Sequence, residues 1–213
     1  MDISILVVCH HDRGYLEQAM RSARRQDFRG SFEVVLQQSD KTMAQNHNIG
    51  FRKCKGEYVK WLHDDDMLTQ NCLTDLWTQR GADVICANAF NFHEDKEDWL
   101  EDWETKSTIP KDMIEIVERY NIHAGTLMYK RQVLLDNPLD ESLWTAEDYE
   151  LNMRLFSKGY KFAYVDKIVS KYRVHSGMKS FPSYGSVSPE RYIERQDEKM
   201  RIQDMYAWKL PRK

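Results

Sequence analysis

The chain has 213 residues, a formal net charge of −3 at pH 7 and 41% hydrophobic residues. This length is typical of one compact domain with a layered core, and the mildly acidic charge argues against a nucleic-acid binder that relies on bulk charge. No apolar run approaches the roughly 20 residues that span a bilayer, and no basic segment with a cleavage site opens the chain, so no signal peptide is expected.

Strands and helices alternate in the first half of the chain. The predicted strands are nearly continuous apolar runs, a pattern typical of strands covered on both faces. The predicted helices carry apolar residues at three- and four-residue spacing. Strands are expected over residues 3–9, 32–36, 58–62 and 84–87, and helices over residues 14–26, 43–54 and 69–77. This alternation predicts βαβ units and a parallel sheet.

The second half changes character. Residues 94–104 are densely acidic and carry Trp99 and Trp103 at helical spacing, so we expect a solvated helix with inward-facing tryptophans. Residues 176–189 are rich in Ser, Gly and Pro and predict a mobile loop. The other expected elements are helices over residues 110–120, 146–157 and 189–208 and strands over residues 126–129, 161–165 and 168–174, with Gly159 ending the middle helix. No repeat or linker is evident, so residues 1–213 are expected to form one domain.

The four cysteines, Cys9, Cys54, Cys72 and Cys86, are widely spaced and form no CxxC pair. This spacing argues against a zinc site. An even number of cysteines permits disulfides, but a long chain without a secretory signal favours free thiols in a reducing compartment. We therefore expect free thiols and a cytoplasmic location.

Three consecutive carboxylates, Asp64, Asp65 and Asp66, follow the third expected strand. Adjacent like charges repel one another, and burial raises the free energy of their ionised forms. A divalent cation such as Mg²⁺ or Mn²⁺ resolves this conflict, because both ions prefer oxygen ligands. A solvated acidic loop is the alternative interpretation. The position favours a metal, since ligands bind at the carboxyl ends of parallel strands, where residues 10–12 and 37–40 also lie.

Two further positions downstream of the triplet permit either a catalytic or a purely structural interpretation. Glu147 and Asp148 begin an expected helix, where Thr145 with an acid three residues later resembles a capping box. The functional alternative is a carboxylate on a rigid helix start that takes a proton from a hydroxyl group. His175 follows the last expected strand; it is either a solvated residue or an imidazole ligand for Mn²⁺. No GxGxxG or GxxxxGK[ST] loop is present, which argues against Rossmann dinucleotide and P-loop chemistry.

Taken in order, these segments resemble the family 2 glycosyltransferases of the GT-A fold. Each motif is loose alone, but the ordered set is specific and spans about residues 3–176. The matching segments are YLEQAMRSARRQ (15–26), FEVVL (32–36), NIG (48–50), KGEYV (55–59), LHDDD (62–66), ED with L, RL and GY (147–160) and YRVH (172–175). They are similar to the family's YLxxAxxSxxxQ, FEIIV, NxG, GEYI, LDxDD, EDxxLxxRLxxxGY and YRxH motifs.

The resemblance implies a largely parallel α/β sheet flanked by helices, with a small antiparallel part on the acceptor side. It implies a nucleotide-binding half of about residues 1–90, an acceptor half of about 91–188 and a C-terminal helix and tail over 189–213. It also implies inverting transfer of a sugar from a nucleotide sugar to a hydroxyl group of a glycan or another surface glycoconjugate.

The site residues follow from the motif positions. Asp66 is expected to bind Mn²⁺ or Mg²⁺, with Asp64 and His175 as further ligands. Asp148 is expected to be the base that deprotonates the acceptor, and Glu147 to position the acceptor. The nucleotide sugar is expected to contact His10, Gln38, Asp40, Asn48, Asp64 and Asp65.

Two departures from the family pattern bear on this site. The residues Gln37-Gln38-Ser39-Asp40 stand where the family usually has an aspartate pair, so the base contact is altered or moves to Asp40, which is alternatively an N-cap. His63 occupies the position of the first aspartate of LDxDD, which leaves the metal ligands within residues 64–66 open.

The donor and acceptor are less sharply indicated. A DxD-type site suits UDP-sugars best, with dTDP-sugars second. The helix from Pro189 and the basic tail can touch a membrane surface or a further domain of a longer chain. The alternatives are a metal-dependent nucleotidyltransferase, for which the residues 10–14 form a poor basic loop, and a non-catalytic carbohydrate-binding domain.

Overall fold

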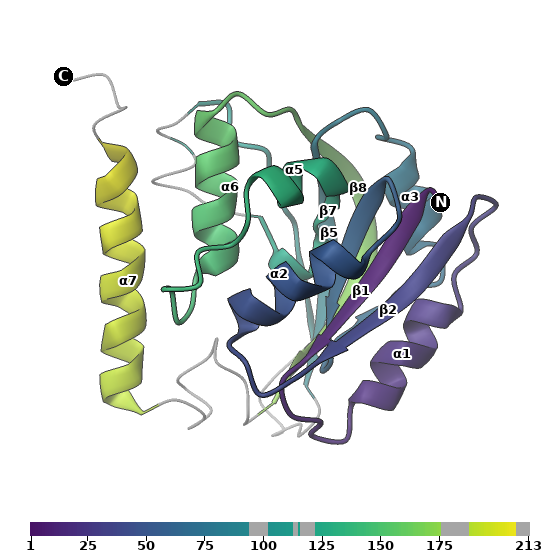
Figure 1. The fold of residues 1–213 in the computed structure, drawn as a ribbon, viewed down its shortest axis with the longest axis horizontal. Helices are drawn as coiled ribbons and strands as arrows, with labels where there is room; N and C mark the ends of the chain where they lie inside the picture. The colour runs from purple at the N-terminus through teal and green to yellow at the C-terminus, as the bar shows by residue number, and fades with distance from the viewer. Residues whose placement is uncertain (94–101, 113–114, 116–121, 176–187, 208–213) are drawn as a thin grey trace.

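The computed structural model describes residues 1–93, 102–112, 115, 122–175 and 188–207. One mixed sheet runs through the centre between helices, and α7 (Pro189–Ala207) stands at one side next to α6 (Glu147–Ser157) (Figure 1). The strand order is β2 (Phe32–Gln38), β1 (Ile3–Cys9), β3 (Tyr58–His63), β7 (Met128–Lys130), β5 (Val84–His93), β8 (Phe162–Val174) and β4 (Met67–Leu68), and β6 (Trp103–Thr105) pairs with β5. The predicted α/β class is confirmed.

Parallel and antiparallel pairings share this sheet. β1 is parallel to both β2 and β3, and β5 is parallel to β8. β7 lies between β3 and β5 and runs antiparallel to both, while β4 and β6 are antiparallel to β8 and β5. The antiparallel portion is larger than expected, because a strand from the second half of the chain enters the middle of the sheet.

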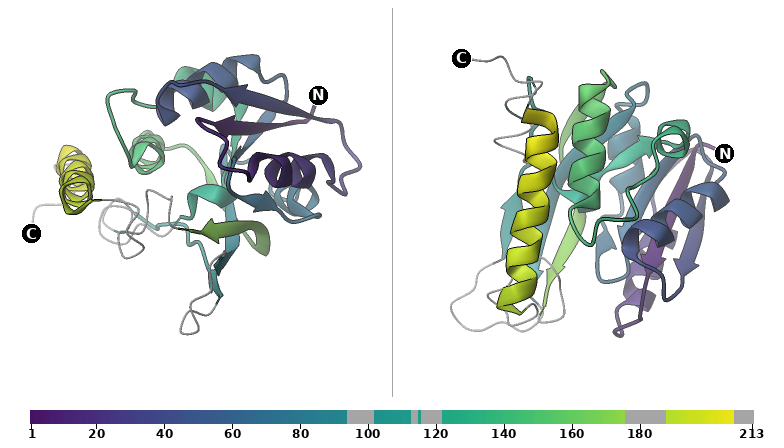
Figure 2. Two further views of the ribbon diagram at one scale, coloured as in Figure 1. Left: turned by 90° about the horizontal axis from the view of Figure 1, so that it is seen from below. Right: turned by 60° about the vertical axis from the view of Figure 1, so that its left-hand side comes forward.

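Helices cover the sheet from both sides (Figure 2). All seven residues of β1 are buried, and its alternating side chains supply two separate cores. On one face, Ile3, Ile5 and Val7 pack with α1 (Leu16–Arg24) and α3 (Cys72–Trp77). On the other face, Leu6 and Val8 pack with α6 and with the helices α2 (Met43–Lys53) and α5 (Arg131–Asp136). The apolar run over residues 3–9 therefore reflects burial on both faces, as predicted.

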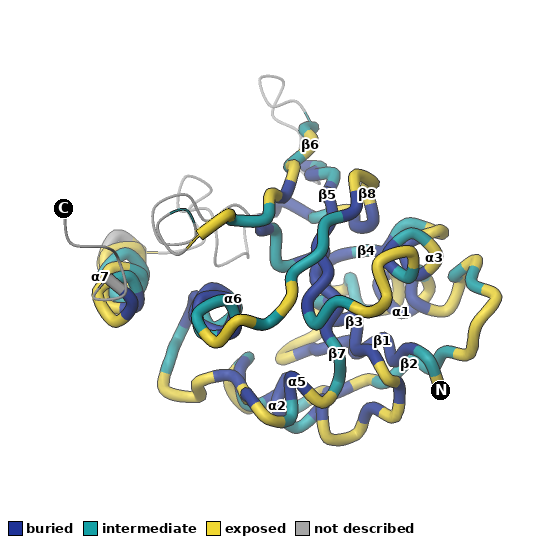
Figure 3. Tube along the Cα trace, turned by 90° about the horizontal axis from the view of Figure 1, so that it is seen from above, coloured by how far each residue is buried: buried dark blue, intermediate teal, exposed yellow. Residues whose placement is uncertain are grey.

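Other expectations from the sequence are also confirmed. The four cysteines are free and buried. The helices α1, α2, α6 and α7 lie within two residues of the expected bounds at most of their ends. Buried segments concentrate in the sheet, and the outer side of α7 is exposed (Figure 3). Among the helices that the structure describes, none is both long and apolar enough to cross a membrane.

Three expectations about residues 84–174 are wrong. β5 continues to His93, well beyond the four residues expected, because it pairs with β8 along its length. β8 is one strand through residues 166 and 167 rather than two. Trp103 lies in strand β6 and not in a helix. The remainder of the predicted acidic helix, most of the predicted helix over residues 110–120 and the predicted loop over residues 176–187 lie outside the described residues.

Two glycines occupy positions that disfavour a side chain, each for a different reason. A Cβ on Gly56, just before β3, would overlap the backbone nitrogen of Ser4 and lie 2.5 Å from the carbonyl carbon of Ile3. Gly159 follows α6 at φ +80° with open space around it, and the amides of Gly159 and Tyr160 bond to the carbonyls of Phe156 and Leu155. This arrangement is a Schellman C-cap.

We expect Gly56→Ala to lower the free energy of unfolding by about 3 kcal/mol, because the clash is with backbone atoms that cannot move aside. Gly159→Ala is expected to cost only about 1 kcal/mol, since it introduces conformational strain without overlap. Urea unfolding of the two variants measures both values. Equal losses in the two variants would contradict the close approach of β1 to Gly56.

Candidate active site

A cleft of about 680 Å³ opens at the carboxyl ends of β1 and β3 and extends to the start of α6 and to α7. Six of the residues predicted from the sequence line it: His10, Asp40, Asp64, Asp65, Glu147 and Asp148. The structure therefore brings Asp64 and Asp65 of the acidic triplet and the carboxylates of α6 to one cavity, although more than 80 residues separate them. Gln38, Asn48, Asp66 and His175 do not line this cleft among the residues described.

The three aspartates after β3 point to different partners. The Asp64 carboxylate accepts a hydrogen bond from the Cys9 thiol at 3.1 Å. The Asp65 carboxylate lies 3.3 Å from Nε2 of His175 and 4.0 Å from the guanidinium of Arg13. Asp66 is 1% exposed, and its Oδ1 accepts the backbone N–H of Arg173 at 3.0 Å. A solvated acidic loop, the alternative interpretation, does not describe this arrangement.

Burial controls the protonation of the triplet. It raises the pKa of Asp66 well above the ordinary value, and the neighbouring Asp65 charge adds to this rise. Burial also raises the pKa of Asp64. At Asp65, burial acts in the same direction, but the hydrogen bond with His175 and the charge of His63 outweigh it, so that the pKa is lowered. A nearby cation would favour the ionised form of all three carboxylates.

His63, Asp65 and Asp66 form a group that fits a divalent cation. One ligand atom from each residue lies within 4.8 Å of the others, and Nδ1 of His63 is 3.9 Å from Oδ2 of Asp66. Among the described residues, this Oδ2 is buried and has no hydrogen-bond partner. A nitrogen and two carboxylates suit Mn²⁺ or Mg²⁺, and an unpaired buried carboxylate oxygen is costly without a cation.

This grouping differs from the ligand set expected from the motif. Asp64 faces Cys9, and His175 contacts Asp65 rather than belonging to the group of three. His63 replaces them, because its side chain at the end of β3 faces Asp66 across one turn of backbone. The signal was present in the sequence, since His63 occupies the position of the family's first aspartate. The geometry therefore offers His63, Asp65 and Asp66 as a second candidate set, and the set expected from the motif, Asp66, Asp64 and His175, stays a prediction.

The other side of the cleft is the start of α6, whose first two residues are Glu147 and Asp148. The residue before them, Ala146, has φ +59° and caps the helix without a side-chain hydrogen bond. The capping-box interpretation of Thr145 is therefore wrong. A left-handed alanine is strained, because its Cβ crowds the backbone.

α7 supplies part of the cleft wall, which the sequence did not predict. Arg195, Lys199 and Gln203 line the cleft at intervals of one helical turn. Burial lowers the pKa of Lys199, Arg195 adds to this effect, and Asp148 opposes it. This side of the cavity is thus built from α6 and α7 together.

Comparison with known proteins identifies the family. The family model described as Glycosyl transferase family 2 matches residues 28–136, which is just over half of the chain. The chain belongs to glycosyl transferase family 2. The matched segment contains β2, α2, β3 and the acidic triplet.

One curated relative shows how far the sequence similarity extends. The chain is 33% identical over 64 residues to glycosyltransferase GlyG of Streptococcus pneumoniae serotype 4 (strain ATCC BAA-334 / TIGR4). The matched segment covers 29% of this chain and 21% of GlyG. The chain therefore spans about a fifth of the length of this curated relative.

The solved structures of S. aureus TarS 1–349 are similar in fold. The complex with UDP-GlcNAc has a TM-score of 0.66 and 18% identity, covering 97% of this chain and 66% of that one. The complex with UDP has a TM-score of 0.62 and 18% identity, covering 97% and 65%. This likeness confirms the GT-A fold that the resemblance implied.

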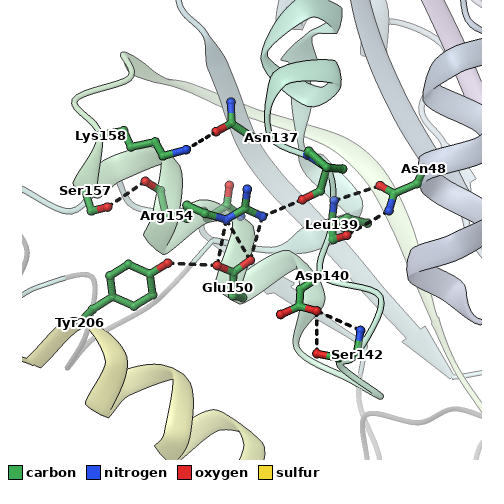
Figure 4. Close-up of polar contacts among 12 residues, drawn as sticks. Asn48, Asn137, Leu139, Asp140, Ser142, Glu150, Arg154, Ser157, Lys158 and Tyr206 are labelled. Carbon is green, nitrogen blue, oxygen red and sulfur yellow. Dashed lines mark hydrogen bonds and ion pairs between the residues drawn. The ribbon is translucent and has the colours of Figure 1, made fainter.

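Two residues expected from the family 2 motifs to contact the nucleotide have other surroundings. Asn48 is 3% exposed. Its side chain exchanges two hydrogen bonds of 2.9 Å with the backbone of Leu139 and donates a third to Glu141 (Figure 4). Asn48 therefore joins α2 to the segment before α6. Gln38 is exposed at the end of β2, and its amide group donates to the Cys9 sulfur at 3.6 Å. Cys9 in turn donates to Asp64, so Cys9 links the two side chains.

Asp40 lies at the rim of the cleft, as expected for a residue near the nucleotide. Its alternative role as a helix cap is wrong, because Thr42 forms the capping box of α2 with Gln45. His10 also lines the cleft, and its Nδ1 lies 3.3 Å from the carbonyl oxygen of Ser39. Both residues line the part of the cleft that lies at the ends of β1 and β2.

A histidine at the start of a short 3₁₀ helix makes the stability of the chain depend on pH. The 3₁₀ helix η1 (Ala124–Thr126) begins at His123, whose Nδ1 accepts the backbone N–H of Gly125 at 3.2 Å. Burial, together with the charges of Lys60 and His63, lowers the pKa of His123 from 6.5 to about 4. The cap requires an unprotonated Nδ1, which agrees with this direction.

We expect the chain to lose stability as the pH falls from about 6.5 toward 4, because the unfolded state binds a proton that folded His123 does not. The slope from this residue is at most about 1.4 kcal/mol per pH unit. His123→Asn should remove that slope and keep the cap, since asparagine is a favoured N-cap residue. Urea unfolding between pH 7 and 4.5 measures the difference, and parallel curves for the two proteins would contradict it.

Proposed function

We propose that this chain is a glycosyltransferase domain that transfers a sugar from a nucleotide sugar, UDP-linked, to a hydroxyl group with inversion at the anomeric carbon. The observation that carries the proposal is one cleft lined both by His63 and Asp65, two members of the candidate cation-binding group, and by the carboxylates of α6. Membership of glycosyl transferase family 2 supports the reaction class, and the UDP-GlcNAc and UDP complexes of TarS support the choice of a UDP-sugar.

The donor occupies the part of the cleft formed by the strand ends. His63, Asp65 and Asp66 would hold Mn²⁺ or Mg²⁺, which neutralises charge on a diphosphate leaving group. Arg13 and Lys41 line the same region and supply further positive charge. Asp40, Asp64 and His10 contact the nucleoside or sugar from the loops after β2, β3 and β1.

The acceptor occupies the part of the cleft beside α6 and α7. Asp148 takes the proton from the acceptor hydroxyl as the oxygen attacks the anomeric carbon opposite to the leaving diphosphate. Glu147, the preceding residue, orients the acceptor. Both carboxylates sit at a helix N-terminus, which fixes their backbone relative to the sheet. We further propose a division in which residues 1 to about 90 hold the donor and the remainder holds the acceptor, with α7 included in the acceptor side.

A nucleotide screen by thermal unfolding tests the donor side. UDP with Mn²⁺ should raise the melting temperature, and removing the metal with a chelator should abolish most of this rise, because binding to the folded state alone stabilises it. UMP is the control, since it lacks the second phosphate that reaches the cation. An equal rise in melting temperature for UDP with and without metal would contradict the metal site. A larger rise with dTDP than with UDP would indicate a dTDP-sugar donor.

A further inference from the structure

The last described helix is fixed to the helix that carries the proposed base. α7 runs beside α6 (Figure 1), and Ile202 and Tyr206 of α7 pack with Tyr149 and Met153 of α6 and with Ala146. The Tyr206 hydroxyl donates to Glu150 at 3.0 Å (Figure 4). Glu150 is 4% exposed and also accepts hydrogen bonds from Arg154. The two helices are therefore joined through both an apolar and a polar contact.

Glu198 makes a different contact, to the backbone in front of α6. One carboxylate oxygen accepts the N–H of Trp144 and the other accepts the N–H of Thr145, each at 2.8 Å. Glu198, Ile202 and Tyr206 are spaced four residues apart, so they share one face of α7. A carboxylate that accepts two backbone N–H groups makes charge-assisted bonds, which are stronger than neutral ones.

The segment that Glu198 holds determines where the base lies. Trp144 and Thr145 precede Ala146, which is strained at φ +59°, and Glu147 and Asp148 follow directly. The start of α6 has no side-chain cap of its own. Glu198, about 50 residues further along the chain, thus holds the two residues that precede the N-cap Ala146. The contact at Trp144 is reinforced by the Arg191 guanidinium, which lies 4.9 Å from the indole ring centre.

We infer that Glu198 is a positioning residue, which holds the turn of residues 144–146 so that Asp148 faces the acceptor hydroxyl. This inference rests on the proposed function for the role of Asp148, but the clamp on the turn stands on the contacts alone. Without the carboxylate, Trp144 and Thr145 lose the two hydrogen bonds that hold the turn just before the left-handed Ala146. The start of α6 then samples other conformations, and the base is misplaced without direct loss of any donor contact.

The test compares Glu198→Gln with Asp204→Asn, which removes an exposed acid from the same helix. A glutamine accepts one N–H, but its amide group opposes the other. We expect kcat to fall about 30-fold and the donor KM to change by less than about twofold, because a displacement near 1 Å costs up to about 100-fold in rate. Glu198→Asp keeps the charge on a shorter arm and should fall between the wild type and Glu198→Gln. Asp204→Asn should match the wild type.

Amide hydrogen exchange on the same variants gives a second readout that does not require activity. Exchange at the Trp144 and Thr145 amides should accelerate at least about tenfold in Glu198→Gln and stay unchanged in Asp204→Asn. Unchanged exchange would overturn the clamp. Faster exchange with an unchanged kcat would overturn the positioning role, as would equal losses in kcat and UDP affinity. If the wild type transfers no sugar, the proposed function fails, while the exchange data still decide the clamp.

Discussion

Asp148→Asn should lower kcat about 1000-fold and leave the affinity for UDP within about threefold of the wild-type value. A positioned general base contributes between about 100-fold and 10,000-fold to such reactions. Asparagine has nearly the same shape but cannot accept the acceptor's proton. Asp148 lines the cleft at the start of α6, away from the group formed by His63, Asp65 and Asp66. Single-turnover transfer and UDP titration measure the two quantities separately.

Glu147→Gln is the matched control for this substitution. Its carboxylate lines the same cleft from the adjacent position, and we expect its loss to raise the acceptor KM more than it lowers kcat. An Asp148→Asn variant that loses UDP binding in proportion to its rate would show that Asp148 supports the donor site instead. An active Asp148→Asn variant together with an inactive Glu147→Gln variant would show that Glu147 is the base and that Asp148 orients the acceptor.

The second large effect concerns the cation. Asp66→Asn should weaken Mn²⁺ binding about 100-fold, on the scale seen when metal sites lose supporting groups. The asparagine oxygen still accepts the N–H of Arg173, so the local fold is kept. Because burial raises the pKa of Asp66 well above its ordinary value, replacing it with a neutral group should leave the metal-free protein at least as stable as the wild type. Calorimetric titration with Mn²⁺ and thermal unfolding measure both effects.

Asp64→Asn provides the control within the same triplet. Its carboxylate faces the Cys9 thiol rather than His63, so Mn²⁺ affinity should stay within about threefold of the wild type. Comparable losses in the two variants would contradict the grouping of His63, Asp65 and Asp66 and would return Asp64 to the ligand set.

The local sequence contains enough information for the first half of the fold. Apart from the two-residue β4, the strands and helices up to residue 77 follow from apolar runs and helical spacing, because each lies against an adjacent layer whose period it matches. The sequence does not reveal that β7 enters the sheet between β3 and β5, since a three-residue strand carries too little pattern to indicate its partners. Trp103 was misassigned for a related reason: β6 also has three residues, which carry too little pattern to distinguish a strand from a helix.

The candidate site was predictable in its location but not in its details. The position after a parallel strand locates the triplet, yet side-chain directions decide that Asp64 faces Cys9 while Asp65 and Asp66 face His63. Thr145 does not cap α6; its backbone N–H instead donates to Glu198, which is about 50 residues away in the chain. Long-range contacts of this kind leave no local pattern. Asn48 shows the converse, because a motif position there proves to join α2 to Leu139.

The most direct test of the central claim follows the reaction of a UDP-sugar with Mn²⁺ and a panel of hydroxyl acceptors by NMR. We predict release of UDP, a new glycosidic linkage of opposite anomeric configuration to the donor, and loss of both when the metal is chelated. Release of pyrophosphate would indicate nucleotidyl transfer, retention of configuration would exclude a direct attack assisted by Asp148, and transfer unaffected by chelation would contradict the cation site.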